Sequence, residues 1–285
     1  MSAPAKVNLY LRVVGRRADG YHLLDSLAVF VDLADALTFS LAPTATLRLR
    51  GPYAQAVGDG ENLVERAGRL LQGAAPPESG CAQLGADVEI EKNIPVAAGL
   101  GGGSADAAAA LDGLNELWRL GLDESVLAVL AAQLGADVPV CRFGRPALMS
   151  GIGDTIVPAP ALPEFALLLV NPNRAVATAD VFRHLSPPFV PPAPLNEAPS
   201  DAAALAEALR QRGNGLTDAA IALCPEIGEA LAQLARLENC LLAQMSGSGA
   251  TCFGLFADLA QAQRAEAQLQ QMRPHWFARA CRVLR

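Results

Sequence analysis

The sequence predicts an α+β protein with two domains that divide near residue 158. Segments in which apolar and polar residues alternate, a pattern typical of half-buried strands, occur in both halves of the chain. Segments with apolar residues three and four positions apart, which indicate helices, lie between them. The length of 285 residues and the hydrophobic content of 52% allow a large core and exclude a disordered chain. We therefore expect one domain over residues 1–158 and a second over residues 159–285.

The N-terminal half begins with a clear strand pattern over residues 5–14. Apolar residues at 7, 9, 11 and 13 alternate with more polar ones, so Lys6 and Asn8 are expected to project from one polar face of a half-buried strand. The Asp19-Gly20 pair predicts a turn after this strand. We expect further strands over residues 27–33, 36–41, 46–50 and 87–92, and helices over residues 62–71, 107–118 and 125–134.

The C-terminal half begins with a short apolar strand over residues 166–170. A segment rich in proline, residues 186–200, is expected to be a loop. Two helices should follow, over residues 202–212 and 226–237. The chain should then end with a strand–turn–strand–helix–strand unit over residues 240–245, 251–256, 260–272 and 276–283.

Charge and hydropathy exclude several classes of protein. The chain has 22 Lys and Arg against 29 Asp and Glu, a net charge of −7, which argues against a nucleic-acid-binding protein. No stretch is apolar enough to predict a membrane span, and no apolar signal segment opens the chain. Six scattered cysteines without a CxxC pair indicate neither a zinc site nor a redox pair. We expect a cytoplasmic protein with reduced thiols, and the sequence carries no indication of its oligomeric state.

Only two of the cationic residues are lysines, Lys6 and Lys92. An ammonium is a compact point charge and a guanidinium is a planar fork, so a lysine in such a chain is a candidate for a role that arginine cannot fill. Lys92 follows a strand rich in acidic residues, which favours a solvated ion pair. Lys6 is the better candidate for a function.

A glycine cluster precedes the helix expected over residues 107–118. Glycines at 99, 101, 102 and 103 allow positive φ angles and a close approach of the backbone to a ligand. The start of a helix adds unpaired N–H groups and a partial positive charge, so a phosphate chain is the natural occupant. Ser104 could cap the helix or contact phosphate, and Asp106 is expected as an acid in its first turn.

The alternative is a flexible connector, because glycine clusters are also common in loops. The cluster matches neither of the two common nucleotide loops. Ser104-Ala105 stands where a Walker A motif needs Lys followed by Ser or Thr, and Ser104 stands where the dinucleotide fingerprint needs its third glycine.

A second glycine cluster, Gly247-Ser248-Gly249, lies between two expected strands. Taken alone, it is more typical of a hairpin turn than of a binding site. Its significance comes from the other motifs that accompany it.

Several segments form an ordered set along the chain: Pro4-Ala5-Lys6-Val7-Asn8-Leu9, Arg17-Ala18-Asp19-Gly20-Tyr21-His22, Leu100 to Ala108, Leu134-Gly135-Ala136-Asp137-Val138-Pro139, Thr178-Ala179-Asp180-Val181-Phe182 and Gly247-Ser248-Gly249-Ala250. This set resembles the GHMP small-molecule kinases, a superfamily that includes galactokinase, homoserine kinase and mevalonate kinase. Within it, the motifs are most similar to the kinases that act on 4-diphosphocytidyl-2-C-methyl-D-erythritol in the non-mevalonate isoprenoid pathway. The resemblance covers nearly the whole chain.

The resemblance implies a two-domain GHMP kinase fold. Its N-terminal domain would be like domain 2 of ribosomal protein S5, and its C-terminal domain would be ferredoxin-like. It implies transfer of the γ-phosphoryl group of ATP to the 2-hydroxyl of the methylerythritol unit, with Mg²⁺ and with a substrate that carries a cytidine diphosphate moiety. Alternatives are another kinase of the superfamily, such as homoserine kinase, or a non-catalytic binding protein on the same fold.

The resemblance also assigns roles to residues. It places Asp137 near the acceptor hydroxyl as general base, with Lys6 beside it, although an aspartate before Val-Pro is otherwise more typical of a turn or helix cap. The ATP-binding segment comprises Pro95, Val96, Ala97, Ala98, Gly99, Leu100, Gly101, Gly102, Gly103, Ser104 and Ala105. The residues that would bind substrate are Asn8, Tyr21, His22, Thr178, Phe182, Gly247, Ser248 and Gly249.

Three remaining features complete the expectations. No set of paired carboxylates indicates a metal site, so ATP itself would supply most ligands to Mg²⁺. His184 and His275 lack the context of His22 and are interpreted as structural. Ala97 and Ala98 stand where some relatives have more glycine, which is expected to be tolerable if their φ angles are negative.

Overall fold

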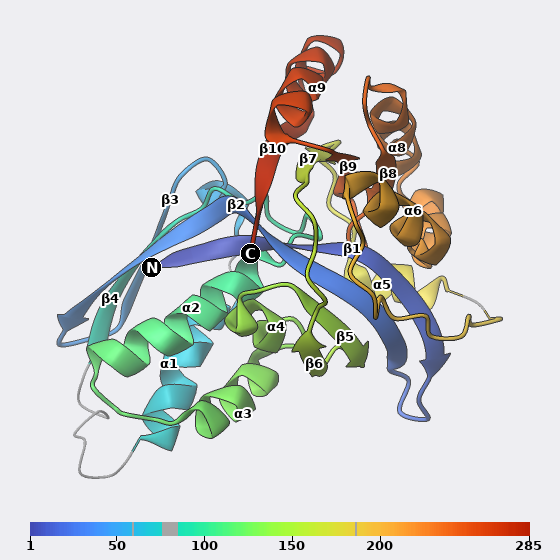
Figure 1. Cartoon of the computed structure of the whole chain (residues 1–285). Helices are drawn as coiled ribbons and strands as arrows, with labels where there is room; N and C mark the ends of the chain where they lie inside the picture. The colour runs from blue at the N-terminus through green and yellow to red at the C-terminus, as the bar shows by residue number, and fades with distance from the viewer. Residues whose placement is uncertain (59, 76–84, 186) are drawn as a thin grey trace. The chain divides into compact units, whose positions relative to one another are not determined.

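The computed structural model describes residues 1–58, 60–75, 85–185 and 187–285 (Figure 1). The chain forms two compact units, each made of three segments. Unit 1 comprises Met1–Ala5, Leu33–Val96 and Gly101–Gly144, and unit 2 comprises Lys6–Asp32, Ala97–Leu100 and Arg145–Arg285. Residues on both sides of position 158 belong to unit 2, so the two units divide the chain differently from the predicted domains 1–158 and 159–285. Those domains stay a prediction.

Two long strands near the N-terminus contribute residues to both units. They are β1 (Ser2–Arg16) and β2 (His22–Ala42). In unit 1, β2 pairs antiparallel with β4 (Gly85–Glu91), which pairs parallel with β3 (Thr46–Arg50). The helices of this unit, which pack against one another beside the sheet in Figure 1, are α1 (Leu63–Ala74), α2 (Gly102–Leu117), α3 (Glu124–Leu134) and α4 (Val138–Phe143). A short 3₁₀ helix, η1 (Ala54–Ala56), follows β3.

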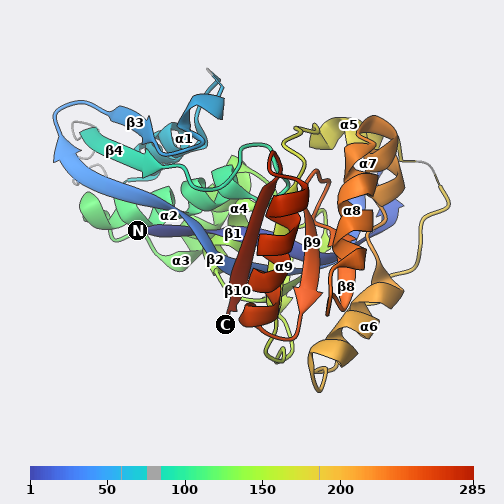
Figure 2. The same ribbon diagram turned by 90° about the horizontal axis from the view of Figure 1, so that it is seen from above.

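Unit 2 contains an antiparallel sheet in the order β2, β10, β7, β9, β8. Its later strands are β7 (Ala166–Asn171), β8 (Leu242–Met245), β9 (Cys252–Phe256) and β10 (Phe277–Leu284). A hairpin of β5 (Ala147–Gly151) and β6 (Thr155–Pro158) pairs with β2 through β5. The helices are α5 (Thr178–Arg183), α6 (Ala202–Arg212), α7 (Thr217–Leu223), α8 (Glu226–Arg236) and α9 (Leu259–Met272). Figure 2 shows α8 and α9 lying along the strands that they contact.

Side-chain caps explain where four of the longer helices begin. Asn62, Asp123, Asp201 and Asp258 each accept a hydrogen bond from a backbone N–H in the first turn of the following helix. Such a cap satisfies one of the donors that a helix start leaves unpaired. The sequence therefore determines these starts locally.

The predicted α+β class agrees with this mixture of strands and helices, but several elements differ from the expectation. The strands predicted over residues 27–33 and 36–41 are one continuous strand, β2. The short helices α4, α5 and α7 and the β5–β6 hairpin were not predicted. Strand β1 is almost completely buried rather than half-buried, so Lys6 and Asn8 share an interior face and not a solvated one.

Two further expectations concern cysteines and membranes. The five cysteines in the described ranges are free thiols, and Cys81 lies outside the described residues, as does Ser186 at the start of the proline-rich segment. Within the described part of the chain, no helix combines the length and the hydropathy that crossing a membrane requires.

Candidate active site

The glycine segment, residues 95–101, leads directly into α2. Gly101 occupies the N-cap position with a left-handed φ of 66°, and the helix begins at Gly102. The first hydrogen bond of the helix joins the Ala105 N–H to the Gly101 carbonyl at 2.8 Å, so the amides of Gly102, Gly103 and Ser104 precede the helical hydrogen-bond ladder. A Cβ atom at Gly103 would meet no heavy atom within 4 Å. The segment therefore has the backbone geometry of an anion site at a helix N-terminus.

Ala97 departs from the expected backbone geometry. Its φ is +53°, in the left-handed region, whereas the φ of Ala98 is not positive. The condition of negative φ angles is thus met at position 98 and fails at position 97. A left-handed conformation costs a residue with a Cβ atom about 1–2 kcal/mol.

This strain predicts that Ala97→Gly is tolerated. Relief of the strain at residue 97 should outweigh the larger backbone entropy that glycine has in the unfolded chain. The side chain of Ala97 is exposed, so its removal loses little contact. The free energy of unfolding should therefore stay equal or rise by up to about 1 kcal/mol. Denaturant titration would measure the change. The matched control, Ala98→Gly at a buried position, should lose about 1 kcal/mol. A comparable loss in Ala97→Gly would contradict the argument.

The two glycine clusters meet within unit 2. A Cβ atom at Gly99 would lie 2.5 Å from the Gly249 carbonyl oxygen, so neither chain segment could approach so closely with a larger residue at 99. Thr251 donates its N–H to the Ala98 carbonyl at 3.2 Å, and Ser246 donates its hydroxyl to the Gly99 carbonyl at 3.1 Å. The second cluster is therefore more than a hairpin turn, because it supports the middle of the first glycine segment.

Asn214 fixes the second glycine cluster from another element. Its side-chain amide donates to the carbonyls of Met245 and Gly247, both at 2.8 Å. No motif or periodicity in the sequence predicts a role for Asn214. Its position just before the start of α7 gave no local signal of a contact with residues more than thirty positions away.

Lys6 lies at the start of a buried chain of hydrogen bonds in unit 2. It is only 3% exposed, and its ammonium donates to Asn8 Oδ1 at 2.8 Å. Asn8 Nδ2 donates in turn to the Ser26 hydroxyl at 2.8 Å, and Ser26 donates to the Tyr10 carbonyl at 2.6 Å. The Asn8 backbone N–H donates to the Ser246 hydroxyl at 3.1 Å. The structure thus brings the predicted residues Lys6 and Asn8 together with the glycine segments through Ser246, while Ser26 orients the Asn8 amide. No sequence pattern predicted either serine.

Asp137 belongs to unit 1, where it occupies the N-cap position of α4. Its φ and ψ are −89° and −11°, and its side chain makes no capping hydrogen bond to the helix. The alternative role of a helix cap therefore does not account for this carboxylate. The pairing of Asp137 with Lys6 stays a prediction, since the two residues belong to different units.

Aromatic side chains gather around His22 in unit 2. The His22 ring stacks on Phe182 with centroids 5.1 Å apart, and Phe189 meets it edge-on at 5.9 Å. Tyr21, next to His22, is 61% exposed. Burial, with a contribution from the Arg16 charge, lowers the pKa of His22 below its usual value, so the ring is neutral at pH 7 and presents one donor and one acceptor nitrogen. Phe189 was not predicted, because the proline-rich segment carries no periodicity.

Thr178 and Ser248 also lie together in unit 2. Their hydroxyl oxygens are 2.8 Å apart, which joins the start of α5 to the second glycine cluster. His184 bonds to the backbone carbonyl of Asp180 through Nδ1, at 2.8 Å. Its structural role stays a prediction.

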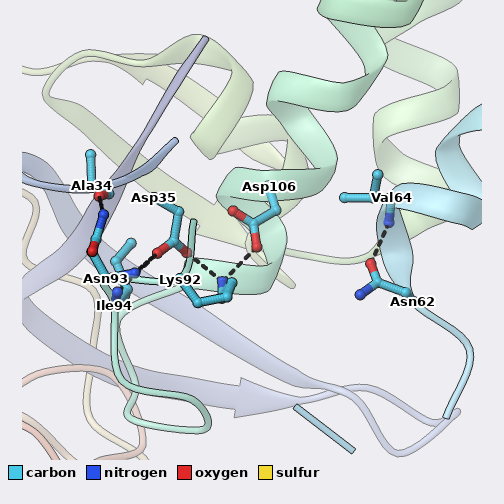
Figure 3. Close-up of polar contacts among 8 residues, drawn as sticks. All are labelled: Ala34, Asp35, Asn62, Val64, Lys92, Asn93, Ile94 and Asp106. Atoms are coloured by element: carbon cyan, nitrogen blue, oxygen red, sulfur yellow. Dashed lines mark hydrogen bonds and ion pairs between the residues drawn. The ribbon is translucent and has the colours of Figure 1, made fainter. Parts of the chain in front are cut away.

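The prediction that Lys92 forms a solvated ion pair is wrong. This lysine is buried with two carboxylates, and its ammonium forms ion pairs with Asp35 and, at 2.6 Å, with Asp106 (Figure 3). Asp106 lies in the second turn of α2 and points inward, so it is not the first-turn acid that was predicted. The nearby acidic residues of β4 misled the prediction, because its real partners come from β2 and α2.

The charges in this cluster shift one another's pKa values. Burial raises the pKa of Asp106 to about 7, the Lys92 ammonium opposes this change, and the Asp35 carboxylate adds to it. Burial lowers the pKa of Lys92, but its two carboxylate partners more than offset this effect and leave it above its usual value. The ammonium is therefore retained despite burial.

Comparison with known proteins adds to this geometry. The family models for the N-terminal and C-terminal domains of GHMP kinases match residues 62–145 and 195–275. A 4-diphosphocytidyl-2-C-methyl-D-erythritol kinase from Paramagnetospirillum magneticum is 50% identical over 284 residues, which cover 100% of this chain and 98% of the relative. The enzyme of the same name from Rhodospirillum rubrum is 48% identical, with coverage of 99% and 92%.

Solved structures agree with the sequence relatives. The crystal structure of a 4-(cytidine 5'-diphospho)-2C-methyl-D-erythritol kinase superposes with a TM-score of 0.80 at 37% identity and covers 99% of this chain and 98% of that one. A mevalonate kinase from L. major has a TM-score of 0.72 at 15% identity, with coverage of 99% and 94%, which shows the shared fold alone. The chain therefore belongs to the 4-diphosphocytidyl-2-C-methyl-D-erythritol kinase family of the GHMP kinases.

Proposed function

We propose that the protein transfers the γ-phosphoryl group of ATP to the 2-hydroxyl of 4-diphosphocytidyl-2-C-methyl-D-erythritol. Family membership supports an ATP-dependent kinase of a small molecule. The observation that favours this substrate over a smaller one is the aromatic group of His22, Phe182 and exposed Tyr21. A pyrimidine base offers a π-face to such rings and a polar edge to the neutral imidazole. We also infer action in the cytoplasm, and the acidic net charge of the chain argues against a nucleic-acid partner.

Residues of this chain would divide the work of phosphoryl transfer, which consists mainly of positioning and electrostatic stabilisation. The substrate hydroxyl oxygen forms a bond to the γ-phosphorus while the bond from phosphorus to the bridging β-phosphate oxygen breaks, and ADP leaves with that electron pair. Asp137 accepts the hydroxyl proton, and the Lys6 ammonium stabilises negative charge on the transferring group. The amides of residues 102–104 hold the phosphates of ATP.

Mg²⁺ would neutralise charge on the triphosphate during this reaction. The described residues contain no group of three or more Asp, Glu, His or Cys side chains that could hold a metal ion. Such a chain fits a cation whose ligands come mainly from phosphate oxygens and water, which is the usual mode of Mg²⁺ binding. The contribution of the protein is then to hold the phosphates.

A coupled assay of ADP release tests the proposed function directly. Purified protein with ATP, Mg²⁺ and the cytidyl substrate should turn over well above background. Turnover with L-homoserine instead would favour the alternative kinase. Absence of ADP release with either acceptor would favour a non-catalytic binding protein.

The aromatic group predicts a separate effect on substrate affinity. Phe182→Leu should raise the KM for the cytidyl substrate about tenfold, because loss of stacking on one base costs about 1–3 kcal/mol. The KM for ATP should stay within about twofold. Phe256→Leu, at a fully buried position of β9, is the control and should lower stability without this selective effect. Equal changes in both KM values for Phe182→Leu would argue against base stacking.

A further inference from the structure

The ion-pair cluster of Asp35, Lys92 and Asp106 joins three elements of unit 1. Asp35 lies on β2, Lys92 directly follows β4, and Asp106 lies on α2 (Figure 3). Asp35 is completely buried and Asp106 is 5% exposed, so these contacts are formed away from water. A single ammonium therefore connects the end of a strand to the helix that follows the glycine segment.

Asp35 also holds the chain where it enters the glycine segment. Its Oδ1 accepts the N–H of Asn93 at 2.6 Å and that of Ile94 at 2.9 Å. At the other end of the segment, a Cβ atom at Gly102 would lie 3.6 Å from Asp35 Oδ2 and 3.2 Å from Ile94 Cγ2. The ion-pair cluster thus fixes both ends of the glycine segment. Asp35 binds the backbone at residues 93–94, before the segment, and Lys92 connects Asp35 to Asp106 of α2, after it.

The charges of the cluster are not arranged for greatest stability. Two carboxylates share one ammonium, and among the described residues Asp106 Oδ1 is buried without a hydrogen-bond partner. Buried ion pairs are weak evidence of stabilisation, and an unsatisfied buried oxygen is costly. This arrangement is explained better by a need to position the neighbouring backbone than by stabilisation of the fold.

We propose that Asp35, Lys92 and Asp106 are positioning residues that clamp both ends of the glycine segment and so hold the amides of residues 102–104 in the orientation that binds the phosphates of ATP. This inference rests on the proposed function, since it takes ATP as the ligand of those amides. The three residues act through the backbone of the segment and touch neither substrate in this role. Their effect should therefore fall on ATP and not on the second substrate.

Two substitutions at position 106 test the clamp. Asp106→Leu removes the acceptor that α2 offers to the Lys92 ammonium and should raise the KM for ATP at least tenfold, with the KM for the cytidyl substrate within twofold. Asp106→Asn keeps an oxygen acceptor of the same shape and should restore the KM for ATP to within about threefold of the wild type. Leu114→Ala, at a buried position farther along α2, is the control for general destabilisation and should lower Tm without changing either KM.

The results can separate the clamp from a purely structural cluster. If Asp106→Leu lowers Tm as Leu114→Ala does but leaves the KM for ATP within twofold, the inference is wrong and the proposed function stands. If both KM values rise together, or if Asp106→Asn is as impaired as Asp106→Leu, the clamp is likewise overturned. If the wild type shows no turnover, the proposed function fails. Calorimetric titration of the same variants with ATP then tests the clamp, because the Kd for ATP should change by the same factors as those expected for the KM.

Discussion

Asp137→Asn is expected to lower kcat by about 10²–10⁴-fold while the KM for ATP stays within about twofold. The substitution keeps the shape of the side chain and removes only its capacity to accept a proton, which is typically worth a factor of this size. Because asparagine has the same shape as aspartate, Tm should change little. Steady-state kinetics with both substrates varied, together with a melting curve, would measure these effects.

Asp123→Asn provides a matched control for Asp137→Asn. Asp123 also occupies an N-cap position, one helix earlier, but its carboxylate does accept a backbone N–H, from Val126 at 3.0 Å. Asparagine is an equally good cap, so this variant should keep the kcat of the wild type. A kcat for Asp137→Asn within about threefold of the wild type would exclude Asp137 as the general base. A parallel loss of ATP affinity would point to a structural role instead.

Lys6→Arg is expected to lower kcat by about 10²-fold or more. Lys6 is 3% exposed and its ammonium lies 2.8 Å from Asn8 Oδ1, and a planar guanidinium cannot place a compact charge at the same point. Loss of one preorganised electrostatic contact to a transition state commonly costs a factor of 10²–10³. Lys6→Met, which keeps most of the length of the side chain and removes its charge, should be at least as impaired.

A control on the same strand distinguishes loss of function from disruption of β1. Arg12 binds the carbonyls of Pro191 and Arg212, and Arg12→Lys exchanges the two cations in the opposite sense. This variant should retain near-normal kcat. If Lys6→Arg were equally active, the special requirement for an ammonium at position 6 would be refuted, and the scarcity of lysine in the chain would be incidental.

Local sequence predicted those elements that repeat their pattern over a sufficient length. Strand β3 and helix α6 occupy the predicted residues 46–50 and 202–212, because alternation in one and helical spacing in the other identify them without tertiary information. Helix α4, with six residues, is too short to complete a recognisable period. Such short elements form because neighbouring segments pack on them.

Long-range contacts limited the prediction of the site in the same way. Lys92 looked solvated beside the acids of its own strand, but Asp35 lies 57 positions away in sequence and Asp106 lies 14 away. Ser246 likewise supports Gly99 across 147 positions. Composition and motifs named the candidate residues, whereas their hydrogen-bond partners depended on which strands became neighbours.

The position of β10 has a consequence for biosynthesis. This strand follows β2 and β7 in the sequence, yet it lies between them in the sheet of unit 2. During translation both neighbouring strands therefore leave the ribosome before the strand that pairs with them, and the sheet closes only once β10 has emerged. Until then the unpaired edges of β2 and β7 are exposed on the nascent chain and need protection from aggregation.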